Sequence, residues 1–159
     1  MAQLRAWLVE DGFADVATHQ AQGNVHLTAA VRSVADLTAE LDDLVSERAG
    51  FPVETVVFAW ADLRRVVDDA AELAPPVTGP DVRQQALLMR EPAAPAVAAA
   101  IERRGTDDVA ARVVDRVIHL WVRTGAAGDP LGFGRVGTTL PVNTMRSRTQ
   151  LEDLVDRWS

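Results

Sequence analysis

The side chains best suited to chemistry in this chain are its three histidines and a group of arginines near its C-terminal end. Between residues 135 and 148 there are three arginines and no acid, although the whole chain has a formal net charge of -7. Guanidinium groups bind carboxylates and phosphates through paired N–H donors. The segment is therefore a candidate anion-binding site. Its candidate residues are Arg135, Asn143, Thr144, Arg146, Ser147 and Arg148.

The same segment has the pattern of a helix start. Ser147 and Gln150 have the spacing of a capping box. Arg146 and Arg148 would then lie in or beside the first turn, where the helix dipole disfavours a positive charge by about 0.3 to 1 kcal/mol. A bound anion would reverse this effect. The alternative is that both arginines face solvent or pair with acidic side chains. The candidate N-caps are Thr144, Ser147 and Thr149.

The histidines offer a second type of chemistry. In the predicted strand 117–122, the two-residue period places His119 and Trp121 on the same face. They are the pocket candidates, and His119 is the one plausible proton carrier; the alternative is a packed, hydrogen-bonded core histidine. His19 and His26 could face each other across a hairpin, but no third ligand with metal spacing follows, so no metal site is predicted.

Other familiar motifs fail in their sequence context. Residues 132–137 match G-x-G-x-x-G, but a dinucleotide site needs a strand before the motif and a helix after it. Glycine- and proline-containing segments flank it on both sides instead. The chain contains no cysteine, which excludes disulfides and thiol chemistry, and no lysine, which excludes Schiff-base and P-loop chemistry. We predict no cofactor.

Composition limits the class of protein. A chain of 159 residues with 48% hydrophobic residues can bury a core. Its acidic balance argues against binding to nucleic acid or to an anionic membrane surface. There is no apolar run long enough to span a membrane and no signal-peptide pattern. These features predict a cytoplasmic protein that binds neither nucleic acid nor membrane.

The hydrophobic periodicity predicts two α+β halves, 1–74 and 83–159, joined by a proline-rich linker at 75–82. The first half reads as helix, strand, strand, helix, strand, helix. Its signals are a helix ended by Gly12, two strands around a bend at 21–24, a helix between a Ser33 capping box and Gly50, a strand at 53–58, and a helix stopped by Pro75. The second half reads as a strand at 84–90, a helix at 95–104, a hairpin of 109–114 and 117–122, a glycine-rich loop at 124–142 and a closing helix containing Leu151 and Trp158.

Several short segments, in order, resemble one family. They are Met-Ala-x-Leu-Arg at 1–5, Gly-Phe-Ala-Asp-Val at 12–16, Gln-Gly-Asn-Val at 22–25, Arg-Ala-Gly-Phe-Pro-Val at 48–53, Trp-Ala-Asp-Leu-Arg at 60–64, and 143–151. In these segments the chain resembles the domain of unknown function 1697 family, which comprises uncharacterised small bacterial α+β proteins. Met145 and Arg146 stand where that family often has tryptophan and asparagine.

The resemblance implies a ferredoxin-like first half that lacks its first strand. Family members carry a strand resembling LLRGINVGG before the methionine that is residue 1 here. In a ferredoxin-like sheet that strand lies between the third and fourth strands, so two inner edges lack a partner. Three outcomes are open: the start codon lies upstream, a neighbouring chain donates a strand, or the flanking strands pair directly.

These observations favour a small non-catalytic domain that binds a ligand or a partner, with a homodimer formed through the unpaired strand edges. The alternative is an enzyme that acts on a phosphorylated or carboxylated metabolite. In that alternative, Arg146 and Arg148 hold the small anionic ligand and His119 carries the proton. RNA binding through the C-terminal arginines is disfavoured by the overall charge.

Overall fold

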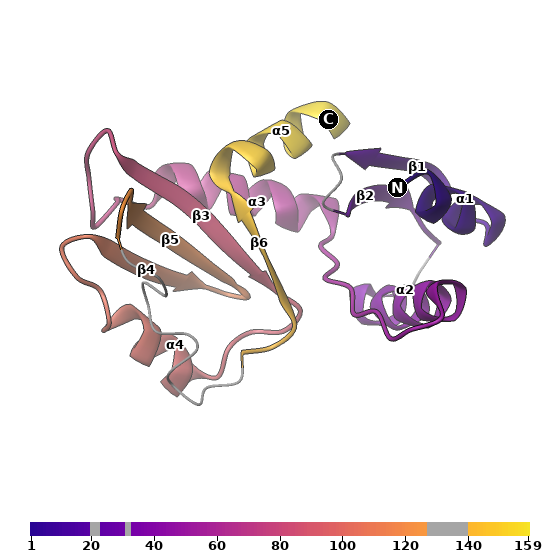
Figure 1. Ribbon diagram of the computed structural model, residues 1–159, viewed down its shortest axis with the longest axis horizontal. Coiled ribbons are helices and arrows are strands. Elements are labelled where there is room, and N and C mark those ends of the chain that lie inside the picture. Colours follow the sequence, from indigo (N-terminus) through magenta and orange to yellow (C-terminus); the bar gives the residue numbers. More distant parts are fainter. Residues whose placement is uncertain (20–22, 31–32, 127–139) are drawn as a thin grey trace. The chain divides into compact units, whose positions relative to one another are not determined.

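The computed structural model describes residues 1–19, 23–30, 33–126 and 140–159 (Figure 1). The chain is an α+β protein, and its described residues form two antiparallel sheets and five helices. It divides into two compact units. Unit 1 comprises Met1–Ala59 and Asp156–Ser159, and unit 2 comprises Trp60–Val155.

Unit 1 begins with helix α1 (Ala2–Glu10), which the sequence predicts. The chain reverses after it at Gly12, whose φ of 98° favours glycine. Strands β1 (Ala14–His19) and β2 (Asn24–Thr28) then pair antiparallel, so the predicted hairpin is confirmed. The apolar core of the unit consists of Leu8, Phe13, Leu37, Leu41 and Leu44.

Helix α2 (Val34–Ala49) has the limits that its capping residues predict. The Ser33 hydroxyl accepts a hydrogen bond from the Asp36 backbone N–H at 3.1 Å and so satisfies a free donor of the first turn. Gly50 ends the helix in the left-handed conformation, with φ of 79°. Both signals are local, which is why the sequence predicts them well.

The strand predicted at 53–58 is wrong. No residue of this segment belongs to a strand ladder in the described part of unit 1. Two of its backbone N–H groups bond instead to side chains of α2: Val53 donates to the Ser46 hydroxyl at 2.8 Å and Thr55 to Asp42 Oδ1 at 2.7 Å. The segment therefore does not pair directly with β2, which was one of the three outcomes left open for the missing strand.

Unit 2 contains a four-stranded antiparallel sheet with the order β4-β5-β3-β6. Its strands are β3 (Val82–Met89), β4 (Val109–Val114), β5 (Val117–Arg123) and β6 (Asn143–Ser147). The predicted hairpin of β4 and β5 is confirmed, with its turn at Asp115 and Arg116. Strand β6 is missing from the sequence-based prediction, which ends the loop at residue 142 and treats the following residues as the start of the closing helix.

The helices of unit 2 are α3 (Trp60–Glu72), α4 (Pro95–Glu102) and α5 (Arg148–Trp158), whose last residues belong to unit 1. Ile101 of α4 packs on one sheet face, against a core that consists of Leu87, Met89, Val109, Ala111, Ile118 and Leu120. Helix α3 contacts the sheet through Gln84, which donates to the Ala70 carbonyl at 2.8 Å. Figure 1 shows α3 passing behind β3.

The predicted linker at 75–82 lies inside unit 2, and the compact units divide at Ala59 instead. Val77 in this segment is buried in a small apolar cluster with Ala110 and Trp121, so the segment is part of the unit's packing. No helix within the described ranges is both long enough and apolar enough to cross a membrane.

Candidate functional site

The second face of the unit 2 sheet carries a row of polar side chains across its strands. Residues directly opposite each other in antiparallel strands project to the same face. His119 lies opposite Arg112 on β4 and opposite Ala86 on β3, and Ala86 lies opposite Arg146 on β6. The order Arg112, His119, Ala86, Arg146 therefore runs straight across the sheet. The register brings together two residues that the sequence singled out separately, His119 and Arg146.

His119 lies at the centre of this row and is completely buried. Its relative exposure is 0%, and neither ring nitrogen has a hydrogen-bond partner among the described residues. Burial lowers the pKa of His119 below its usual value of 6.5, while the negative charge of Asp69 on α3 acts in the opposite direction. The sequence left open that His119 is a packed, hydrogen-bonded core residue. The ring is packed, but it is not hydrogen-bonded to any described residue.

Trp121 occupies the adjacent position on the same face and is 3% exposed. It packs with Val77 and Ala110, and partly buried Leu73 and Val82 pack against this cluster. Trp121 is thus a core residue. The two pocket candidates share a face, as the strand period predicts, and both are enclosed.

Arg146 is half-buried and lies in β6, before the helix rather than inside its first turn. Its Nη1 donates to the Thr144 hydroxyl and, at 2.8 Å, to the Met145 carbonyl. Desolvation by burial lowers the pKa of Arg146 below its usual range. Thr144 projects to the same face as Arg146, because the two residues are two positions apart in one strand.

Arg148 is the first residue of α5 and has structural partners. Its Nε donates to Glu152 at 2.7 Å, one turn further along the helix, and its Nη1 donates to Gln84 Oε1 at 3.2 Å. The ion pair with Glu152 offsets the unfavourable position of a cation in the first turn. Of the predicted alternatives for Arg148, pairing with an acid on the same helix is the one observed.

The capping box at the start of α5 is confirmed. Gln150 N donates to the Ser147 hydroxyl at 3.2 Å, and Ser147 N donates to the Gln150 side-chain oxygen at 2.9 Å. Asn143 is exposed and its side chain donates to the Pro141 carbonyl at 2.8 Å. Arg135 lies outside the described residues, as does the glycine motif at 132–137.

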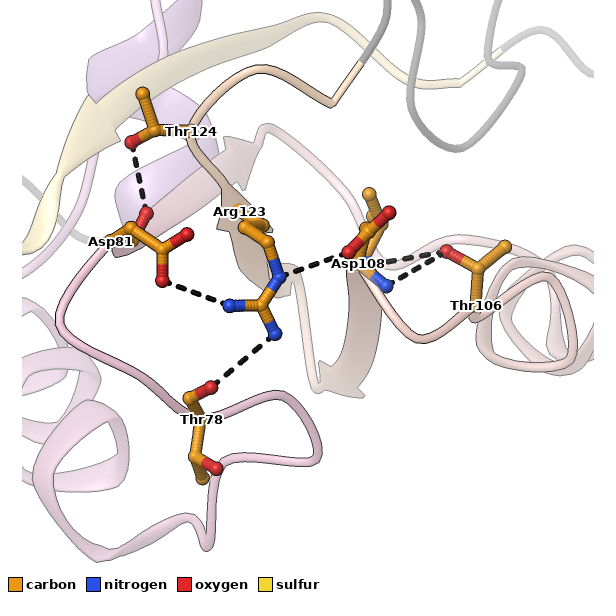
Figure 2. A network of polar contacts seen from close by, with 7 residues as sticks. Thr78, Asp81, Thr106, Asp108, Arg123 and Thr124 are labelled. Atoms are coloured by element: carbon orange, nitrogen blue, oxygen red, sulfur yellow. Dashed lines mark hydrogen bonds and ion pairs between the residues drawn. The ribbon is translucent and has the colours of Figure 1, made fainter.

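Sequence reasoning missed a polar network around Arg123, at the end of β5 (Figure 2). The Arg123 guanidinium donates to Asp81 at 2.8 Å and to Asp108 at 2.9 Å, and also to the Thr78 carbonyl at 3.4 Å. The two carboxylates raise the pKa of Arg123. The network joins the loop before β3 to the loop before β4, and its groups satisfy one another. It is therefore a structural clamp.

Gly79 allows this clamp to form. Its φ is +140°, and a Cβ at this position would lie 3.0 Å from the Asp81 carboxylate and 3.1 Å from Arg123 Nη1. Both contacts are tight enough that the Asp81 and Arg123 side chains would have to shift, and the backbone conformation also favours glycine. Gly79, two residues before Asp81, was the signal available in the sequence, but Arg123 and Asp108 of the clamp come from distant segments.

The other two histidines lie in unit 1. The register places His19 and His26 on the same face of the β1–β2 hairpin, and both rings contact Trp158. The centroid distances to Trp158 are 6.5 Å for His19 and 5.3 Å for His26. Within the ranges that the structure describes, no group of three or more histidine, cysteine, aspartate or glutamate side chains is arranged to hold a metal ion.

Comparison with known proteins gives a family but no characterised relative. No curated protein and no solved structure matches the chain. One family model, described as "Protein of unknown function (DUF1697)", matches residues 1–119, which end at the buried histidine of β5. Because this match covers most of the sequence, the chain belongs to the DUF1697 family of proteins of unknown function.

Proposed function

We propose that this protein is a cytoplasmic interaction domain without catalytic activity, and that it associates with a second copy of itself along the edge of β2. The observation that carries this proposal is in unit 1. Val57 packs against the same apolar core as Val25 and Leu27 of β2, yet its segment 53–58 joins no strand ladder in the part of the unit described. The segment 53–58 and β2 thus share an apolar core, but the described ladders do not join them.

The edge of β2 supports this proposal. Within the described residues the ladder partner of β2 is β1 alone, so its other edge belongs to no described ladder and is the edge available for strand addition. A two-stranded sheet is marginally stable by itself and gains from a third strand. Strand addition supplies that strand through main-chain hydrogen bonds, and two identical edges related by a twofold axis complement each other.

Two measurements made on the same samples, the molecular mass and the hydrogen-exchange protection of backbone amides, test this proposal. The molecular mass is measured by light scattering over a wide range of protein concentration, and the amide hydrogen exchange of β2 by NMR at both ends of that range. Alternate amides of an antiparallel strand face opposite edges. We therefore expect a concentration-dependent dimer in which alternate amides of Asn24–Thr28 gain protection while the remaining ones are already protected by β1.

The outer edges of unit 2 provide the control. Strands β4 and β6 are also sheet edges, and their amide protection should not change with concentration if association uses β2. A monomer at all concentrations would contradict the proposal. A dimer that protects β4 or β6 instead of β2 would contradict the assigned edge.

A second candidate function is supported by one observation, the alignment of His119 and Arg146 in one cross-strand row with only the small side chain of Ala86 between them. This arrangement fits an enzyme that acts on a phosphorylated or carboxylated small molecule, with Arg146 for the anion and His119 for the proton. Thermal unfolding with inorganic phosphate and small carboxylates tests it. A site saturated at about 100 times its dissociation constant adds roughly 2.7 kcal/mol of stability.

The matched variants for this test are Arg146→Gln and Arg65→Gln. Arg65 is an exposed arginine of α3 that pairs only locally with Asp62 at 2.7 Å, so its loss leaves the row intact. Stabilisation that persists in Arg65→Gln and disappears in Arg146→Gln would support the anion site. Absence of stabilisation in the wild-type protein by every anion would exclude it.

A further inference from the structure

The buried ring of His119 stands out as a titratable group enclosed without polar partners. It is fully buried, and both ring nitrogens are unpaired in the described structure. A neutral imidazole tolerates such a site at moderate cost, whereas an imidazolium ion loses its hydration and gains no hydrogen bond in return. The site therefore accommodates one protonation state much better than the other.

The charged groups around His119 do not remove the preference of the site for the neutral ring over the protonated ring. Arg112 on β4 lies directly opposite His119, and Arg146 on β6 lies in the same row beyond Ala86. Arg148 at the start of α5 contacts Gln84, two residues along β3 from Ala86. These three side chains carry positive charges on the neighbouring elements, and none of them stabilises a positively charged ring. Asp69 on α3 favours it, but desolvation by burial is the larger influence.

Helix α3 is the element that a charge on His119 would affect. Its Ala70 carbonyl accepts hydrogen bonds from Gln84 at 2.8 Å and from Arg148 at 3.5 Å, which hold this part of α3 to the sheet. The residue before it, Asp69, is the acid whose charge acts on the ring of His119. Separation of this end of α3 from the sheet would therefore open the side of the sheet on which His119 lies to water.

We propose that His119 is an acid-sensitive latch in unit 2: α3 stays packed on the sheet while His119 is neutral and separates from it when His119 binds a proton. The direction follows from proton linkage. The packed state has a lowered pKa for His119, whereas the open, hydrated state retains the ordinary value near 6.5. The open state therefore binds the proton more strongly, and acid favours it.

The pH window also follows. Above pH 6.5 the ring is neutral in both states and the packed state is fully favoured. As the pH falls below that value, the equilibrium constant for opening rises by up to about tenfold per pH unit, until the ring titrates in the packed state as well. Below that second pKa no further opening is caused by His119.

Amide hydrogen exchange of α3, corrected for the intrinsic pH dependence of exchange, tests the latch. In the wild-type protein we expect exchange from residues around Ala70 to rise by up to about tenfold per pH unit below pH 6.5. His119→Leu, which cannot titrate, should give a flat profile. His119→Gln provides a polar, non-titrating second variant. His19 and His26 are present in every sample, so differences between samples isolate His119.

A direct titration of the His119 ring by NMR in the wild-type protein completes the test and does not depend on any variant folding. We expect its pKa below 6.5, and a lower value still in Asp69→Asn, because that variant removes the favourable charge. A ring pKa at or above 6.5 would overturn the proposal. Identical pH profiles of α3 exchange in the wild type and His119→Leu would overturn it as well.

Discussion

Arg148 and Gln84 are joined by a hydrogen bond of 3.2 Å, and both also donate to the carbonyl oxygen of Ala70. One backbone carbonyl of α3 thus receives a side chain from β3 and another from α5. This relationship explains why a cation is placed in the first turn of a helix, where the dipole disfavours it. Arg148 holds three elements of unit 2 together.

Removing this connection should destabilise unit 2. We expect Arg148→Ala to lower the free energy of unfolding by about 1 kcal/mol, because it loses the hydrogen bonds to Gln84 and Ala70 as well as the ion pair with Glu152. Glu152→Gln removes only the ion pair and should cost about 0.3 to 0.5 kcal/mol. Urea unfolding measures both values. Equal losses in the two variants would mean that the contacts to Gln84 and Ala70 contribute nothing.

Replacing His119 with leucine should stabilise the protein at neutral pH. The substitution exchanges two unpaired ring nitrogens for apolar atoms in a fully buried site, and we expect a gain of about 1 to 2 kcal/mol in the free energy of unfolding. The gain should increase on acidification, because only the wild type then has a ring to protonate. Chemical unfolding at several pH values measures it. A loss of stability at neutral pH would show that the nitrogens are satisfied.

The Arg123 clamp should control the loops that it joins. In Arg123→Gln we expect faster hydrogen exchange of the amides of Val82 and Thr124, which donate to Gly79 and Asp81 in the clamped loop. High salt should reduce the difference, because the charges are exposed and screened. Arg65→Gln, which breaks a solvent-exposed pair on α3, is the control. Unchanged exchange in Arg123→Gln would show that the backbone alone fixes this loop.

Asp42 should hold the extended segment of unit 1 on α2. Its Oδ1 accepts from both the backbone N–H and the hydroxyl of Thr55, each at 2.7 Å. Because bonds to a charged acceptor are comparatively strong, we expect Asp42→Ala to cost about 2 kcal/mol. Asp43→Ala, an exposed acid on the same helix, should stay within about 0.5 kcal/mol of the wild type. Comparable losses of unfolding free energy in both variants would show that the charge of the helix, and not the bonds to Thr55, causes the effect.

The parts of the fold that the sequence predicts are those with local causes. Helix α2 lies between Ser33 and Gly50, and each contributes a capping interaction within a few residues. The β4–β5 hairpin has a two-residue turn and mostly apolar strands. Strand β6 has neither signal. It contains one β-branched residue, Thr144, it lies at a sheet edge, and its partner β3 is distant in the sequence.

The sequence predicts which candidate residues share a face within one strand, but not which residues of different strands lie side by side. The two-residue period of β5 places His119 and Trp121 on one face from sequence alone. The alignment of His119 with Arg146 depends on the register of β3 against both neighbours, which no local pattern specifies. The segment 53–58 illustrates the opposite error, since its residues favour a strand but the described sheet of unit 1 gives it no partner.

The position of β3 between β5 and β6 has a consequence for protein synthesis. Strand β3 leaves the ribosome before both of its partners, and β5 follows it well before β6. A nascent chain can therefore pair one edge of β3 with β5 while the backbone of the other edge still waits for residues 143–147. Translation that stops before β6 would release a chain with an apolar, unpaired edge, which is a template for aggregation.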